Sequence, residues 1–210
     1  MKNLLLINMA LRFRKYLWFL IAVLGLGPAL ATNPIDSFGA AQRTQETMQS
    51  TQRSEIESLR DVIRNERLRR EQPKQVIAAI KRLGELKAAS AVDDLVNLLT
   101  FRQTFDFETK DAINEIRLIT PGDRYPATSA FFQIGRPSLP ALIKVIEAHK
   151  AGSIESENSI YAVTGIFREN LSEGTAYLRN AAAKSPRRFG SQRLLTAASR
   201  IEEMARKSGK

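Results

Sequence analysis

Few residues of this chain have the types and spacing that catalysis or metal binding requires. Cysteine is absent, and His149 is the only histidine among the 210 residues. A zinc site would therefore depend mostly on carboxylates, which zinc sites rarely use. Asp93 and Asp94 are adjacent, so on a helix their side chains point about 100° apart and do not form a paired acid–base site. We expect no catalytic residue, no metal site and no cofactor.

The known catalytic motifs are missing as well. The sequence has no Gly-x-Ser-x-Gly, Ser-x-x-Lys or His-Glu-x-x-His pattern and no phosphate-binding loop. His149 lies near the end of an expected helix, where an imidazole more often complements the helix dipole than acts as a base. The sequence therefore favours a protein that is not an enzyme.

Positive charge is concentrated near the C-terminus. The chain has 32 basic and 22 acidic residues, and residues 175–210 carry nine basic and two acidic ones. Such a patch can bind anionic lipid head groups, an acidic partner or nucleic acid. Phe189 is the only aromatic residue nearby, so binding of single strands by stacking is not supported. The alternative is a solubilising charge on a helix that caps the domain. The predicted basic patch consists of Arg179, Lys184, Arg187, Arg188 and Arg193.

The elements that position these residues follow from a pattern that occurs twice, over residues 76–99 and 128–146. Each copy has apolar residues three and four apart, then a glycine, then a second amphipathic segment, which predicts two helices. We expect Gly84 and Gly135 to end the first helix of each pair in the left-handed conformation. A recurring helix pair cannot bury its apolar face alone, so the pattern predicts a stacked α-solenoid. No stretch alternates long enough to predict a strand, and the fold class is all-α.

Further helices are expected on both sides of these pairs. Ser54 and Glu57 form a capping box that predicts a helix start at Ser54. Apolar spacing predicts a helix around residues 112–119 and a weaker third unit over 160–183. A last helix over 191–207 should direct four residues inward, namely Leu194, Leu195, Ala198 and Ile201.

The two copies resemble the short bacterial HEAT repeat, including the type first described in phycobilisome lyases. The matching segments are Ala79–Gly84, Ala91–Leu99, Ala130–Gly135 and Pro137–Ile146. The resemblance implies a curved stack of antiparallel helix pairs whose concave face, lined by the second helix of each pair, binds proteins. By position it implies a partner-binding role for Asp93, Asp94, Asn97, Lys144 and Glu147. The alternative is that these residues are the solvated sides of amphipathic helices.

The N-terminus predicts export. Residues 1–31 contain a basic flank, an apolar run over 16–24 and an Ala29-Leu30-Ala31 cleavage site, the layout of a secretory signal peptide. The run is shorter than the roughly 20 residues that a membrane span needs, although an uncleaved anchor is the alternative. Residues 32–53 are polar and predict a flexible tether, and residues 54–210 form the HEAT-like domain. We expect the protein in the bacterial periplasm or secreted, without a membrane span after cleavage.

These observations predict an exported, non-catalytic scaffold or adaptor that binds a protein partner on the surface of a helical stack. The alternative is an electrostatic binder of an anionic envelope surface or nucleic acid through the basic C-terminal region. Export makes nucleic acid the less expected of these partners.

Overall fold

The computed structural model describes residues 34–103 and 120–207, with side chains from Met48 onward. These residues form helices and no strand, which confirms the predicted all-α class. The chain divides into two compact units, Met1–Thr47 and Met48–Lys210, and only a stretch of helical backbone is described in the first. The predicted signal peptide and the helix expected around 112–119 lie outside the described residues. Within the described ranges, no helix is long and apolar enough to cross a membrane.

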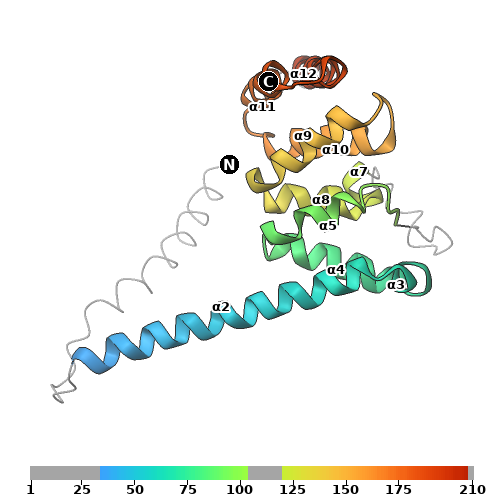
Figure 1. The fold of residues 1–210 in the computed structure, drawn as a ribbon. Helices are drawn as coiled ribbons and strands as arrows, with labels where there is room; N and C mark the ends of the chain where they lie inside the picture. Colours follow the sequence, from blue (N-terminus) through green and yellow to red (C-terminus); the bar gives the residue numbers. More distant parts are fainter. Residues whose placement is uncertain (1–33, 104–119, 208–210) are drawn as a thin grey trace, which may run out of the picture. The chain divides into compact units, whose positions relative to one another are not determined.

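The helices follow one another along the chain as coloured in Figure 1. The α-helices are α2 (Pro34–Arg64), α3 (Glu66–Glu71), α4 (Pro73–Glu85), α5 (Val92–Val96), α7 (Pro121–Arg124), α8 (Pro126–Ile134), α9 (Leu139–Ala148), α10 (Ile154–Ile166), α11 (Leu171–Lys184) and α12 (Arg188–Lys207). Two short 3₁₀ turns, η1 (Ala89–Ala91) and η2 (Arg136–Ser138), precede α5 and α9.

Helix α2 begins at Pro34, so Ser54 lies inside it and the predicted helix start at Ser54 is wrong. No proline or glycine interrupts residues 40–64, and Gln, Glu, Arg and Ala have favourable helix propensity. The polar stretch 32–53 is therefore helical from Pro34 onward. The break comes instead at Asn65, whose side chain accepts hydrogen bonds from two backbone N–H groups in the first turn of α3.

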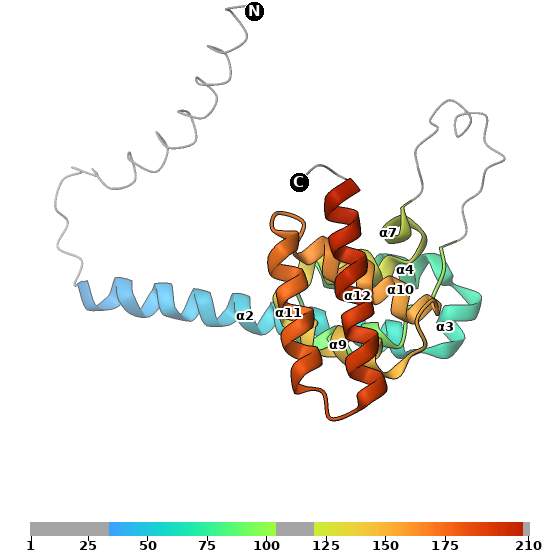
Figure 2. The same cartoon turned by 90° about the horizontal axis from the view of Figure 1, so that it is seen from above.

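The helices of Met48–Lys210 pack by contacts between elements far apart in the sequence (Figures 1 and 2). Helix α8 contacts α4 and α10, helix α9 contacts α5, α10 and α12, and α11 packs along α12. Leu195 was expected inward but is 47 % exposed, because it lies about 100° around the helix from buried Leu194. The other predicted apolar stripes supply the core, including Val76, Ile80, Leu83, Leu95, Leu98, Leu99, Leu139, Leu142, Ile146, Ile160, Val163, Ala198 and Ile201.

The two glycines of the repeated pattern have different roles. Gly135 follows α8 with φ 78°, in the left-handed region where glycine is favoured, which confirms its predicted function as a helix stop. Gly84 is buried inside α4, so the predicted stop there is wrong; Lys87, with φ 50°, takes the left-handed position instead. A Cβ atom on Gly84 would lie 2.9 Å from the Cα of Ala130, so glycine is required by the close approach of α4 and α8.

Two buried polar side chains differ in how they are satisfied. Asn158 of α10 donates a hydrogen bond of 2.7 Å from Nδ2 to the carbonyl of Leu99, and the two residues are 59 positions apart. The hydroxyl of Thr128 in α8 is fully buried and has no hydrogen-bond partner in the described part of the chain. Burial of a hydroxyl without a hydrogen bond costs free energy. The hydrogen bond of Asn158 offsets the cost of removing its amide from water.

Candidate functional site

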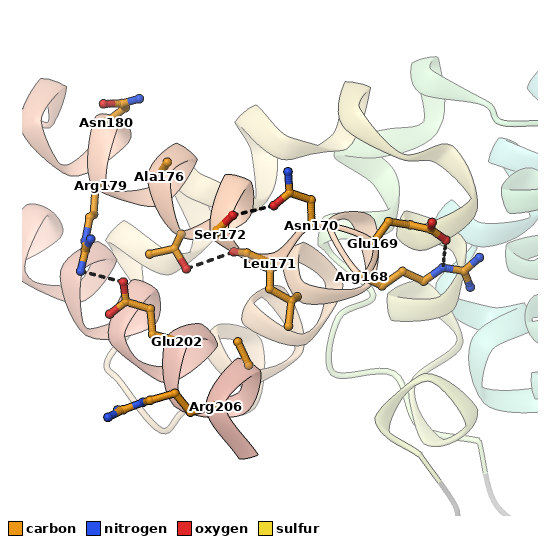
Figure 3. A pocket seen from close by; sticks show the side chains of 12 residues that line it. Arg168, Glu169, Asn170, Leu171, Ser172, Ala176, Arg179, Asn180, Glu202 and Arg206 are labelled. Carbon is orange, nitrogen blue, oxygen red and sulfur yellow. Dashed lines mark hydrogen bonds and ion pairs between the residues drawn. The ribbon is translucent and has the colours of Figure 1, made fainter. Parts of the chain in front are cut away.

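A cavity of about 870 Å³ lies along α11 and α12 and beneath the turn that precedes α11 (Figure 3). Three arginines line it: Arg168, Arg179 and Arg206. Arg179 forms an ion pair of 2.8 Å with Glu202, and Arg168 lies 3.6 Å from the carboxylate of Glu169. Most of the charge in this cavity is therefore balanced internally.

The uncharged walls of the same cavity offer amide groups. Asn170 caps α11 and accepts a hydrogen bond of 2.6 Å from the hydroxyl of Ser172. Asn180 lies further along α11 and is exposed, and its amide makes no hydrogen bond within the described residues. An amide side chain has both donors and acceptors, so Asn180 is available to a polar ligand.

A second cavity of about 670 Å³ lies between α8 and α10. Its aromatic wall is formed by Phe132 and Tyr161, whose ring centroids are 5.4 Å apart. The ring of Phe132 lies against Gly165, where a Cβ atom would come within 2.3 Å of the ring. Gln133 adds an exposed amide that has no hydrogen-bond partner in the described ranges.

The two cavities meet at Arg168 and Glu169, which line both. We call the combined depression the long groove. It runs across α8, α10, α11 and the side of α12, and it combines two aromatic rings, free amides and internally paired charges. This composition is suited to binding a ligand that is neither strongly charged nor wholly apolar.

The aromatic wall was not among the predicted site residues, although the sequence contains a signal for it. Phe132 and Tyr161 each follow a buried residue, Phe131 and Ile160 respectively. The next residue of a helix lies about 100° around the axis, so a large side chain at that position projects away from the core. An aromatic residue next to an inward-facing residue is therefore a candidate for a groove wall.

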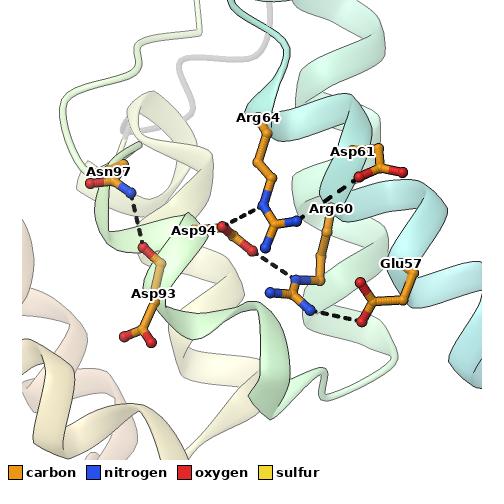
Figure 4. A network of polar contacts seen from close by, with 7 residues as sticks. All are labelled: Glu57, Arg60, Asp61, Arg64, Asp93, Asp94 and Asn97. Atoms are coloured by element: carbon orange, nitrogen blue, oxygen red, sulfur yellow. Dashed lines mark hydrogen bonds and ion pairs between the residues drawn. The ribbon is translucent and has the colours of Figure 1, made fainter.

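Asp94, expected on the partner-binding face, is instead the centre of an internal network (Figure 4). Its carboxylate accepts hydrogen bonds of 2.7 Å from the Nε atoms of both Arg60 and Arg64, which belong to α2. The Asp94 side chain is only 14 % exposed. The network joins α5 to the end of α2, and the Asp94 carboxylate is occupied by these pairs.

The same network lowers the pKa of Asp94. Burial acts to raise the pKa, because a carboxylate loses hydration there, but the hydrogen bonds from Arg64 and Arg60 and their positive charges outweigh that effect. Conversely, the hydrogen bond to Asp94 is the main reason that the pKa of Arg60 lies above its ordinary value. The charged forms of Asp94 and Arg60 are therefore stabilised in the folded state.

The other four residues expected on this face are placed differently from one another. Asp93 and Asn97 are exposed on and just after α5, where the Asn97 amide donates to the Asp93 carbonyl at 3.2 Å. Lys144 is exposed on α9, whereas Glu147 is partly covered by the first turn of α12. No hydrogen bond or ion pair joins the α5 pair to the α9 pair within the described part of the chain.

The five residues of the predicted basic patch do not form one uniform cluster. Arg179 is paired with Glu202 in the long groove. Arg193 is partly buried and donates a hydrogen bond of 2.7 Å from Nη1 to the carbonyl of Glu147 in the last turn of α9. Lys184, Arg187 and Arg188 are exposed around the turn between α11 and α12 and have no ion-pair partner among residues 34–103 and 120–207.

His149 follows α9, and its Nδ1 atom lies 3.8 Å from the carboxylate of Glu155. Among the described residues, no group of three His, Asp or Glu side chains is placed to hold a metal ion. The long groove contains no histidine. The amides and aromatic rings that line the groove can bind a ligand by hydrogen bonds and aromatic contacts.

Comparison of the chain with protein-family models, with curated proteins and with solved structures found no match. The functional interpretation therefore depends on the geometry of the groove and of the basic turn.

Proposed function

We propose that this chain is an exported, non-catalytic protein-interaction module, built as a HEAT-like solenoid, that binds a segment of a partner protein in the long groove. The observation that carries the proposal is the groove itself: two adjoining cavities of about 870 and 670 Å³ that meet at Arg168 and Glu169. Together the adjoining cavities exceed the roughly 300–1,000 Å³ of a typical small-molecule pocket, which favours an extended segment as the ligand.

The helix contacts support the solenoid part of the proposal. Helices α4, α8 and α10 contact one another in that order, and α5, α9 and α12 form a second series of contacts. The third unit departs from a regular repeat, because α12 continues the second series in place of α11, the helix that follows α10 in the sequence. Each unit thus buries its apolar stripe against the next, as stacked repeats require. Helix α11 adds a further layer against α12.

The chemistry of the groove favours a polypeptide. A peptide backbone presents one donor and one acceptor at nearly every residue. The free amides of Gln133 and Asn180 can pair with both, and the rings of Phe132 and Tyr161 can take an apolar side chain. Because most charges in the groove are already paired, we expect binding to depend only modestly on salt.

Affinity capture with crosslinking tests the proposal. The tagged protein, with a photo-crosslinking amino acid at Arg206, an exposed residue that lines the groove, is produced in its source cells and washed at low and at high salt. Wild type should crosslink a discrete partner that survives high salt. Ala176→Trp, which places an indole in the groove from an exposed position of α11, should abolish the crosslink.

Ala78→Trp is the matched control, because Ala78 is an exposed alanine on α4 that does not line the groove. It should leave the crosslink unchanged, and both variants should unfold at the same urea concentration as wild type. Capture that is equal in wild type and Ala176→Trp, or no discrete partner at high salt, would refute the proposed role of the groove.

A further inference from the structure

The turn between α11 and α12 combines an exposed aromatic ring with positive charges that have no carboxylate partner among the described residues. Phe189 is 74 % exposed, the highest exposure among the large hydrophobic residues that the structure describes. Arg187 and Arg188 directly precede it in the sequence, and Lys184 ends the preceding helix. Exposure of a whole phenylalanine ring to water is unfavourable, so a ring in this position is a candidate for contact with another surface.

The local packing holds the ring outward. Gly190, the next residue, is buried with the side chains of Ser185 and Glu147 around it, where even a Cβ atom would lie 3.1 Å from the Ser185 hydroxyl. This contact places the first turn of α12 against α9. The Ser185 hydroxyl also donates to the Arg187 carbonyl at 3.3 Å. The turn that joins α11 to α12 in Figure 2 is therefore held in place at Ser185 and Gly190. Phe189 lies beside these contacts, in the first turn of α12.

The charges around the ring are available. Many arginines elsewhere in the described helices are paired with carboxylates, for example Arg60 with Asp94 and Arg200 with Glu157. Lys184, Arg187 and Arg188 have no such partner within the described ranges, although Glu147 lies close to Gly190. We define Lys184, Arg187, Arg188 and Phe189 as the basic turn.

We propose that the basic turn docks this protein on an anionic lipid surface, with its three cations against head-group phosphates and Phe189 entering the interface. Basic residues beside an apolar side chain are the combination that binds such surfaces, because Coulomb attraction and burial of apolar area add. None of the four residues lines the long groove, so this inference does not depend on the proposed binding of a partner peptide.

Two other anionic ligands fit less well. Binding of single-stranded nucleic acid uses several aromatic platforms for successive bases, and the basic turn has only Phe189. Recognition of an acidic protein motif by a cluster of cationic side chains would leave the exposed ring of Phe189 without a role. A turn with an exposed ring suits a broad, soft surface such as a lipid interface.

Vesicle co-sedimentation of the full chain tests the proposal. Phosphatidylcholine vesicles with and without phosphatidylglycerol are compared at low and high salt. Each cation near an anionic surface contributes about a fivefold change in affinity, so Arg187→Ala with Arg188→Ala should weaken binding roughly 30-fold. Phe189→Ser should weaken it roughly tenfold and, unlike the arginine pair, should do so at high salt as well.

The matched control is Lys74→Ala with Lys81→Ala, which removes the same charge from exposed positions of α4 that have no ion-pair partner in the described part of the chain. All variants carry the same residues 1–31, so differences between them report on the turn. The proposal is overturned if the control pair loses as much affinity as the arginine pair, or if all variants bind equally. It is also overturned if a single-stranded oligonucleotide binds the basic turn more tightly than the vesicles do.

Discussion

Substitution of Gly84 by alanine tests the packing of α4 on α8. The added Cβ atom would lie 2.6 Å from the Gln133 Oε1 atom, 2.9 Å from the Cα of Ala130 and 3.2 Å from its Cβ. The glutamine is exposed and can move away, but the Ala130 backbone cannot move without shifting α8. Carbon atoms in contact lie about 3.5–4.0 Å apart, so the two helices must separate by several tenths of an ångström.

Two opposing terms set the size of the effect. Overpacking of a core typically costs about 1–3 kcal/mol, and replacing glycine by alanine inside a helix contributes about 1 kcal/mol of stability. The overpacking term is expected to win because the contact is with backbone. We therefore expect Gly84→Ala to lower the free energy of unfolding by about 1–2 kcal/mol, measured by urea denaturation followed by circular dichroism.

A double-mutant cycle shows whether Gly84→Ala destabilises the protein through the contact with α8 or because residue 84 needs a left-handed backbone conformation. Ala130→Gly removes the nearest Cβ atom, so the double variant should recover at least about 0.5 kcal/mol relative to additivity. Gly122→Ala is the control, because its nearest neighbours lie 3.7 Å or more away, and it should be neutral or stabilising. A Gly84→Ala protein more stable than wild type would refute the described approach of α4 and α8, whereas zero coupling would assign the whole cost to the backbone contact with Ala130.

Three further predictions concern polar side chains and one concerns export. Asp94→Asn should destabilise the protein by roughly 1–2 kcal/mol near pH 7, because hydrogen bonds from arginine to a carboxylate are lost. Because folding lowers the pKa of Asp94, this stabilisation is fully present above the unfolded pKa of about 4 and disappears as the pH falls through the folded pKa. The urea midpoints of wild type and Asp94→Asn should therefore converge in acid. Thr128→Val should stabilise the fold by about 1 kcal/mol in a thermal melt, because it removes a buried hydroxyl without a partner; a destabilised variant would indicate an unrecognised hydrogen bond. Asn158→Ala should cost about 2 kcal/mol in chemical denaturation by leaving the buried Leu99 carbonyl unpaired, and an unchanged midpoint would contradict the described bond. Intact-mass measurement of the protein recovered from its source cells should give a chain that begins at Thr32, whereas a full-length mass would favour an uncleaved anchor.

The apolar pattern predicted much of the core because burial has a clear period along a helix. Val76, Ile80 and Leu83 share one face of α4, and each is fully buried. Gly135 was predictable as a stop because the apolar stripe ends just before it. The role of Gly84 was not, because a glycine required by a neighbouring helix has the same local sequence as one that ends its own helix.

The candidate site was less predictable because it depends on which elements meet. The position of Asp94 in a helix was predictable from the sequence. Its pairing with Arg60 and Arg64, which lie 34 and 30 residues earlier, was not, because it requires the end of α2 to lie against α5. The basic patch was identified by composition alone. Only the packing separates Arg193, held by the Glu147 carbonyl, from the exposed charges of the basic turn.

The hydrogen bond from Asn158 to the Leu99 carbonyl also constrains the order in which the protein can mature. The acceptor leaves the ribosome 59 residues before its donor. At a synthesis rate of about 5–20 residues per second, the Leu99 carbonyl waits roughly 3–12 s without its partner. During that interval the helices up to α5 lack the hydrogen bond that α10 later supplies. The nascent N-terminal half is therefore expected to remain incompletely packed until α10 has been synthesised.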